Sequence, residues 1–141
     1  MPMSNIGRAK SFLKDGATFA LVGGDEVITC NRRGIAPLLE FAESGKNLSG
    51  FSAADKIVGK AAAMLYVLMG AEAVYAEVMS RAADGVFTSF GVAHSCETLV
   101  DFIVNRRGDG VCPMENAVKD ITQPAQAVPA LRATLNALSG S

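Results

Sequence analysis

The stretch "ATFALVGGDEVITC", residues 17–30, decides the fold. Two apolar runs rich in β-branched residues, "ATFALV" and "EVITC", flank the short polar connection "GGD". Such a connection between two strand-like runs is typical of an antiparallel β-hairpin, because glycine adopts the backbone angles that a tight turn requires. We therefore expect the first two strands of a sheet here.

Outward from this hairpin, helical and strand-like patterns alternate along the chain. Helix ends are indicated by glycines that follow apolar patterns of helical spacing: Gly16, Gly45, Gly70 and Gly91. Ser52 is a suitable N-cap for a long central helix. Helices are expected at residues 4–14, 35–45, 53–69, 81–91, 96–105, 113–121 and 124–138, and further strands at residues 73–80 and 92–94.

This order of elements favours an α/β fold. Strands that alternate with helices imply parallel crossover connections, and these would adjoin the antiparallel hairpin to give a mixed sheet. We expect a three-layer α/β/α sandwich formed by one domain over residues 1–141.

Composition excludes several classes of function. Half of the 141 residues are hydrophobic, 19% are charged and the net charge is −1, so the chain offers no general attraction for nucleic acid. No secretory signal precedes residue 17, and the longest strongly apolar run, residues 61–69, is shorter than the roughly 20 residues of a bilayer span. We expect a cytoplasmic protein that contacts no membrane, with Cys30, Cys96 and Cys112 reduced.

The segment "NRRGDGVCPMENAV", residues 105–118, concentrates specialised residues in one loop. Pro113 suits the first turn of a helix and Glu115 its third position, which places Cys112 at or near the N-cap. The helix dipole there favours a thiolate, so Cys112 is a candidate catalytic residue. The candidate ligand-binding residues of the loop are Asn105, Arg106, Gly108, Gly110 and Glu115. The alternative is structural: a buried cysteine, turn glycines and solvated arginines.

A second candidate region is the start of the expected long helix. Lys56 and Lys60 would lie one turn apart there, with Asp55 beside them and Gly59 between them. A glycine inside a helix costs about 1 kcal/mol relative to alanine, so we expect another group to approach closely at Gly59. Asp55 and Lys56 are candidate catalytic residues and Lys60 a candidate ligand-binding residue. A solvated lysine stripe remains the alternative.

Four segments resemble one family of small prokaryotic proteins, the domain-of-unknown-function 1893 family. They are "RGIAPLLE" (33–40), "ADKIVGKAAA" (54–63), "VYAEVMS" (74–80) and the loop segment at 105–118. The resemblance implies a cytidine-deaminase-like fold and no established activity. Deaminases of that fold hold a catalytic zinc with a His-or-Cys-x-Glu motif at the first long helix and a Pro-Cys-x-x-Cys motif at the helix after the third strand.

The sequence departs from both zinc motifs. We align Asp55-Lys56-Ile57 with the first and Ser80-Arg81-Ala82-Ala83 with the second, and neither supplies a sulfur or imidazole ligand. We therefore expect no metal and no cofactor, and count Ser80 as a further candidate ligand-binding residue.

Three functions are compatible with these patterns. The first is a cysteine-dependent enzyme without zinc that binds a small anionic or nucleotide-like ligand; Cys112 would be its nucleophile or general acid, and Asp55 or Lys56 would move protons. The second is a ligand- or redox-sensing module that acts as a homo-oligomer. The third is a structural subunit. A zinc-dependent deaminase is the least favoured alternative.

Overall fold

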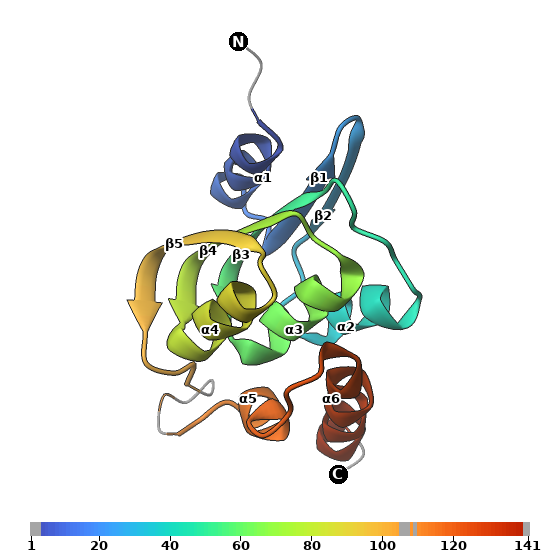
Figure 1. Cartoon of the computed structure of the whole chain (residues 1–141), viewed down its shortest axis with the longest axis vertical. Helices are drawn as coiled ribbons and strands as arrows, with labels where there is room; N and C mark the ends of the chain where they lie inside the picture. The colour runs from blue at the N-terminus through green and yellow to red at the C-terminus, as the bar shows by residue number, and fades with distance from the viewer. Residues whose placement is uncertain (1–3, 105–107, 109, 140–141) are drawn as a thin grey trace.

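The computed structural model describes residues 4–104, 108 and 110–139 as a five-stranded sheet with helices on both faces (Figure 1). The elements follow one another as α1 (Asn5–Lys14), β1 (Phe19–Gly23), β2 (Glu26–Cys30), α2 (Ala36–Glu43), β3 (Ser52–Val58), α3 (Lys60–Met69), β4 (Ala73–Ser80), α4 (Arg81–Ser89), β5 (Ala93–Val100), α5 (Pro113–Val118) and α6 (Pro124–Ser139).

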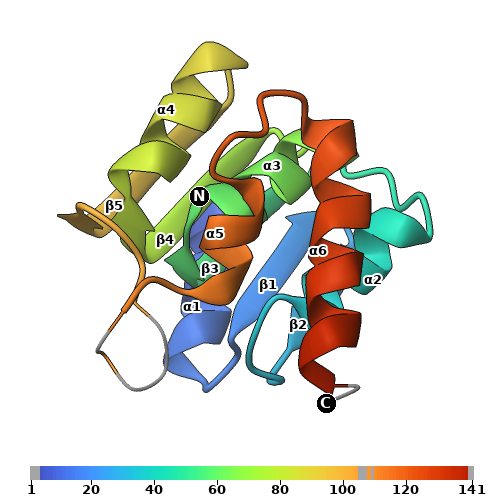
Figure 2. The ribbon, with the colours of Figure 1, turned by 90° about the horizontal axis from the view of Figure 1, so that it is seen from below.

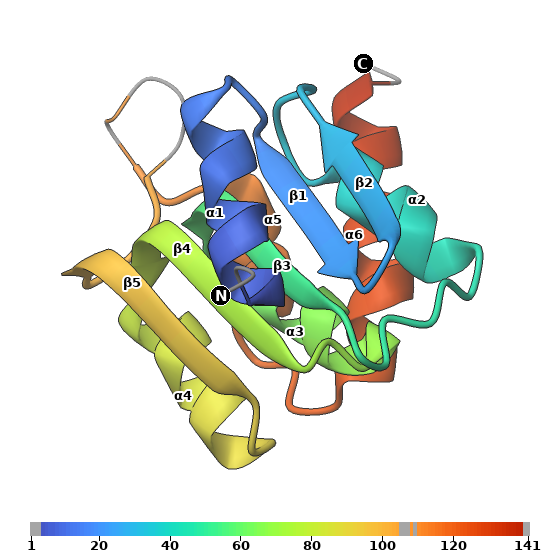
Figure 3. The ribbon, with the colours of Figure 1, turned by 90° about the horizontal axis from the view of Figure 1, so that it is seen from above.

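The sheet is mixed, with the strand order β2-β1-β3-β4-β5 (Figure 3). Strand β1 pairs antiparallel with both β2 and β3, whereas β3, β4 and β5 run parallel to one another. The hairpin expected from residues 17–30 is confirmed. The parallel strands are joined through α3 and α4, as crossover connections require.

Two apolar clusters hold the layers together. On one face, α1 packs Ala9 and Leu13 against Ala20, Val22 and Ala54 of the sheet. The larger cluster covers the opposite face, where residues of α2, α3 and α4 meet the sheet and α5 and α6 pack outside them (Figures 1 and 2). The expected α/β class, with helices on both faces of a mixed sheet, is confirmed.

The expected helix at residues 53–69 is wrong in its first half. Residues Ser52–Val58 form β3, and α3 begins only at Lys60. Strand β3 lies between β1 and β4, and its first three residues are buried. A strand covered on both faces shows a continuous apolar run and no alternation, so its pattern resembles that of a buried helix.

The expected helix at residues 96–105 is also wrong. The strand expected at 92–94 extends over Ala93–Val100 as β5 and pairs with β4 from Ala73↔Ala93 to Ser80↔Val100. This edge strand is largely exposed, so its apolar residues do not alternate clearly with polar ones. Within the described part of the chain, two helices, α5 and α6, therefore follow β5 where three were expected.

Candidate functional site

A cavity of about 220 Å³ lies where the parallel strands end. Chains that leave the carboxyl ends of parallel strands meet at one edge of a sheet, which is the usual ligand position in α/β folds. Lys60 begins α3 after β3, Ser80 ends β4, and Asp101 follows β5. The residues that line the cavity are Lys60, Ser80, Ala82, Asp101, Phe102, Val111, Glu115 and Lys119.

Glu115 of α5 closes the start of α3. Its Oε1 accepts a hydrogen bond of 2.7 Å from the backbone N–H of Lys60, and its Oε2 accepts one of 2.9 Å from Ala61. A helix leaves its first N–H groups without partners and carries positive charge at this end, so a carboxylate is the preferred cap. Residues that lie 55 and 54 positions apart in the chain are joined in this way.

Gly59 is required by this contact. A Cβ atom at residue 59 would lie 2.3 Å from Oε1 of Glu115 and 2.5 Å from its carboxyl carbon, so no larger residue fits while the carboxylate is seated. The close approach that the sequence predicted at Gly59 is confirmed. The group that approaches is a side chain of the same protein, and Gly59 precedes α3 as its N-cap residue.

Of the residues that the structure describes, Lys60 and Lys119 are the positive side chains that line the cavity. The Lys60 ammonium donates one hydrogen bond of 2.8 Å to the carbonyl oxygen of Lys119, which leaves two of its three N–H groups for other acceptors. Asp101 Oδ1 accepts a hydrogen bond of 2.8 Å from Nε of Arg81. The ion pairs between described residues include neither Lys60 nor Lys119.

Ser80 is almost fully buried, with 1% of its surface exposed. Its Oγ accepts a hydrogen bond of 3.1 Å from the backbone N–H of Ala83 and so caps α4. Three residues that the sequence singled out, Lys60, Ser80 and Glu115, thus reach one cavity from three different elements. Lys119 was not anticipated, because nothing in the sequence relates it to Lys60.

The loop before α5 is described only in part. Asn105, Arg106, Arg107 and Asp109 lie outside the described residues. Gly108 has a φ of 76°, which favours glycine, and Gly110 lies at a partly buried bend.

Cys112 occupies the N-cap of α5, as the sequence predicted, but its side chain makes no capping hydrogen bond. Its backbone N–H donates to the carbonyl oxygen of Ile103 at 3.1 Å. The residue is half-buried and packs against the larger core cluster. Cys112 follows Val111, a wall residue, but does not itself line the cavity.

Asp55 and Lys56 do not lie at a helix start, contrary to expectation. Both belong to β3, and neither lines the cavity. Asp55 Oδ2 accepts a hydrogen bond of 2.7 Å from the hydroxyl of Tyr66, a fully buried residue of α3. Strand geometry directs Lys56 to the opposite face of the sheet, because neighbouring side chains of a strand alternate.

Burial alters the titration of this pair. Loss of solvent raises the pKa of Asp55 to about 7, although the bonds from Tyr66 and the backbone N–H of Ile57 oppose this rise. Burial, together with the charge of Asp55, raises the pKa of Tyr66 well above its ordinary value. Tyr66 was not singled out from the sequence, although a tyrosine within the apolar run "AAAMLYVLM" requires a partner for its hydroxyl.

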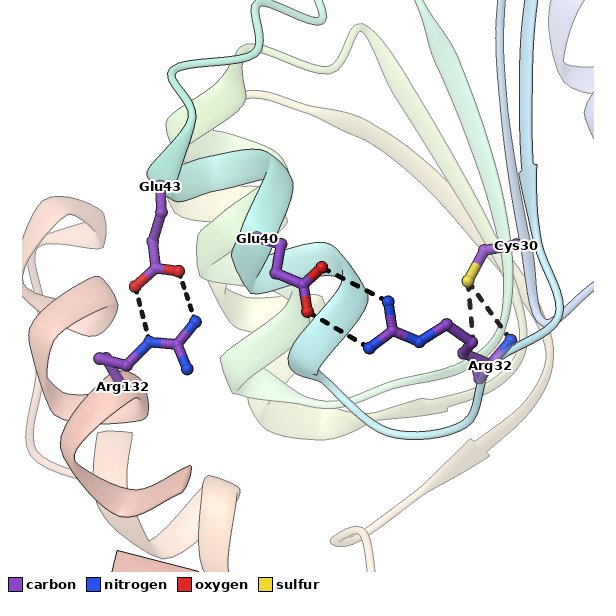
Figure 4. A network of polar contacts seen from close by, with 5 residues as sticks. All are labelled: Cys30, Arg32, Glu40, Glu43 and Arg132. Atoms are coloured by element: carbon purple, nitrogen blue, oxygen red, sulfur yellow. Dashed lines mark hydrogen bonds and ion pairs between the residues drawn. The ribbon is translucent and has the colours of Figure 1, made fainter. Parts of the chain in front are cut away.

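A second polar cluster connects β2, α2 and α6 (Figure 4). Arg32 bonds both carboxylate oxygens of Glu40 at 3.3–3.4 Å, and Arg132 of α6 forms the equivalent pair with Glu43 of α2. The hydrogen bond from Arg132 lowers the pKa of Glu43. A groove of about 500 Å³ lies between the end of α1 and Thr29–Arg32. Since one pair joins α2 to the segment after β2 and the other joins α2 to α6, we assign them a structural role.

The fold and the cavity define an α/β protein with a candidate site at the carboxyl edge of its parallel strands. A family model, the domain of unknown function DUF1893, matches residues 8–135, and the chain belongs to this family. A similar solved structure is the DUF1893 family protein TM1506 from Thermotoga maritima, with 25% identity and a TM-score of 0.84. The match covers 94% of this chain and 92% of that one. Comparison with curated proteins gives no match.

The residues at the start of α3 do not fit a catalytic zinc. The alignment of the second zinc motif with Ser80–Ala83 was wrong, because residues 52–58 form the third strand and Ser80 ends the fourth. The helix after the third strand is α3, and the sequence at its start is Gly59-Lys60-Ala61-Ala62. No sulfur or imidazole is available there, and both oxygens of Glu115 are bonded to backbone amides. Within residues 4–104, 108 and 110–139, no three His, Cys, Asp or Glu side chains form a group that could hold a metal ion. No helix in the same residues is both long and apolar enough to cross a membrane.

The contact between Gly59 and Glu115 predicts coupled effects on stability. Glu115→Ala leaves two amides without their acceptor and should lower the free energy of unfolding by about 2 kcal/mol. Gly59→Ala should lower the free energy of unfolding by a similar amount, because its Cβ displaces the carboxylate. In the Glu115→Ala background, where no carboxylate is present, the same substitution should lower it by less than about 0.5 kcal/mol. Urea denaturation of the wild type, the two single variants and the double variant measures these free energies. Gly85→Ala, at an exposed and open position of α4, is the control and should not lower the free energy of unfolding. Additive losses would contradict the contact.

The raised pKa of Asp55 predicts a pH-dependent stability. The folded protein retains the proton up to about pH 7, whereas the unfolded chain releases it near 3.8. The free energy of unfolding contributed by this group should therefore fall as the pH rises from about 4 to 7 and then stay constant. Relative to Asp55→Asn, wild-type protein should lose on the order of 2 kcal/mol over this range, allowing for partial exposure.

Denaturant unfolding of wild type and Asp55→Asn, measured at intervals between pH 4 and 9, follows this decline in the free energy of unfolding. Asp25→Asn, a substitution in the exposed turn between β1 and β2, should retain the wild-type decline. A constant difference between wild type and Asp55→Asn across this range would show that Asp55 titrates normally.

Proposed function

We propose that this protein binds a small anionic or nucleotide-like molecule in the cavity at the carboxyl ends of β3 and β4. The observation that carries the proposal is the meeting of Lys60, Ser80 and Glu115, from three elements, around one cavity. Ligands of open α/β sheets bind at this edge, where loops and helix starts converge.

Side-chain cations supply the attraction for the anion. The amides at the start of α3 are already filled by Glu115, so the helix end itself holds no external anion. Lys60 keeps two N–H donors, and Lys119 adds a second ammonium group. Asp101 lines the same cavity as a further acceptor, which suits a ligand that also carries hydroxyl or amino groups.

The fold proposed for this activity is cytidine-deaminase-like without zinc. The mixed five-stranded sheet with helices on both faces supports that assignment. The chemistry at Gly59–Ala62 supports a role that does not depend on a metal. Cys112, which follows the wall residue Val111, remains the candidate for a reactive group beside the ligand.

Titration with inorganic phosphate and with ribose 5-phosphate tests the proposal. We expect both to shift the backbone NMR resonances of Lys60, Ser80 and Glu115, and we expect Lys60→Met to weaken binding about tenfold through the loss of one ammonium contact. Lys14→Met, at an exposed position of α1, is the matched control and should leave the affinity unchanged. If neither anion shifts these resonances, or if both variants weaken binding equally, the cavity is not an anion site.

A further inference from the structure

The cavity has an apolar lip formed by Phe102, Val104 and Val111. These side chains are 59%, 49% and 52% exposed, respectively. An isolated antiparallel bridge pairs Val104 with Val111, and the 3.1 Å bond from the N–H of Cys112 to the oxygen of Ile103 continues that pairing. Two chain segments are therefore held side by side at the mouth of the cavity, and Phe102 and Val111 form part of its wall.

This arrangement places an apolar surface beside a charged one. Single exposed apolar residues are common, but three on adjoining segments at the edge of a polar cavity are typical of a binding surface. Lys60 and Lys119 line the same cavity as Phe102. A ligand that satisfies both parts would carry an anionic group at one end and an apolar, flat group at the other.

The volume of the cavity and its open apolar side limit the kind of ligand further. At about 220 Å³ the cavity is smaller than the roughly 300–1,000 Å³ of sites that enclose a whole ligand. The anionic end would fill it, and the remainder would lie over the open lip. A rigid ring buries more area against a one-sided surface than a flexible chain does, and it loses less conformational entropy on binding.

We propose, building on the function proposed above, that the ligand is a nucleoside monophosphate or a close analogue. Its phosphate meets the ammonium groups of Lys60 and Lys119, and its base stacks on Phe102 beside Val111. Asp101, also in the wall, accepts hydrogen bonds from the sugar hydroxyls.

The test compares adenosine 5′-monophosphate and cytidine 5′-monophosphate with ribose 5-phosphate, which has the same phosphate and sugar but no base. Calorimetric titration of the full chain should give nucleotide dissociation constants at least tenfold lower than that of ribose 5-phosphate, as expected for one base stacked on an aromatic ring. Phe102→Ala should bring the nucleotides to the level of ribose 5-phosphate and leave ribose 5-phosphate itself unchanged. Phe102→Tyr should retain the preference.

Phe90→Ala is the matched control, because Phe90 is 44% exposed and lies at the C-cap of α4. It should alter neither affinity, and circular dichroism should show that all variants are folded. Equal affinities for nucleotides and ribose 5-phosphate would overturn this inference and leave the proposed anion site intact. Hexyl phosphate that binds as tightly as the nucleotides would also overturn this inference, because any apolar group would then replace the base. If no phosphate compound binds, both proposals fail.

Discussion

The bidentate contact between Glu115 and the first amides of α3 is the constraint on which the candidate site depends. It connects the short helix α5 to the centre of the domain across more than fifty residues of chain. Met114 and Val118, the buried residues of α5, add apolar contact. The carboxylate fixes α5 against the helix start with two hydrogen bonds, and the bond from Lys60 to the carbonyl oxygen of Lys119 adds a third. The position of α5 in turn sets part of the cavity lining, because Glu115 lies in α5 and Lys119 at its C-cap.

The same contact determines which groups can meet a ligand. An open helix start attracts anions through its free N–H groups, but here an internal carboxylate takes that place. Among the described residues, the positive charge at the cavity is therefore carried by Lys60 and Lys119. This division separates a structural anion, which stabilises the fold, from the side chains that we propose for recognition. The hydrogen-bonded pair of Asp55 and Tyr66 does not line the cavity, and it acts on stability through its protonation.

Much of the fold can be predicted from the sequence where local signals are strong. The hairpin follows from its glycine turn, and the end of α3 follows from Gly70, whose φ of 86° is left-handed. Prediction failed for β3 and for β5 beyond its first residues, because both segments read as helices. The first three residues of β3 are buried and show no alternation, and the edge strand β5 is exposed along most of its length. In both cases pairing with β4 decides the structure, and a local pattern does not contain that information.

The site was predicted through single residues and not through its geometry. Gly59 showed that something approaches the chain, but nothing in the sequence identified Glu115 as the group that does so. Lys60 lines the cavity, but the sequence placed it beside Asp55 and Lys56. Those two residues belong to β3 and do not line the cavity. Lys119 accepts a hydrogen bond from Lys60, 59 residues away, and Tyr66 donates one to Asp55, 11 residues away. Such pairs can be recognised only in the folded chain.

Hydrogen exchange of the Lys60 and Ala61 amides tests the role of Glu115 most directly. NMR would compare wild-type protein with Glu115→Ala, and the amide of Leu65, inside α3, serves as the internal reference for overall stability. The account predicts that Lys60 and Ala61 are protected in the wild type and exchange at least tenfold faster, relative to Leu65, in the variant. Equal relative rates in the two proteins would contradict the claim that Glu115 holds the start of α3.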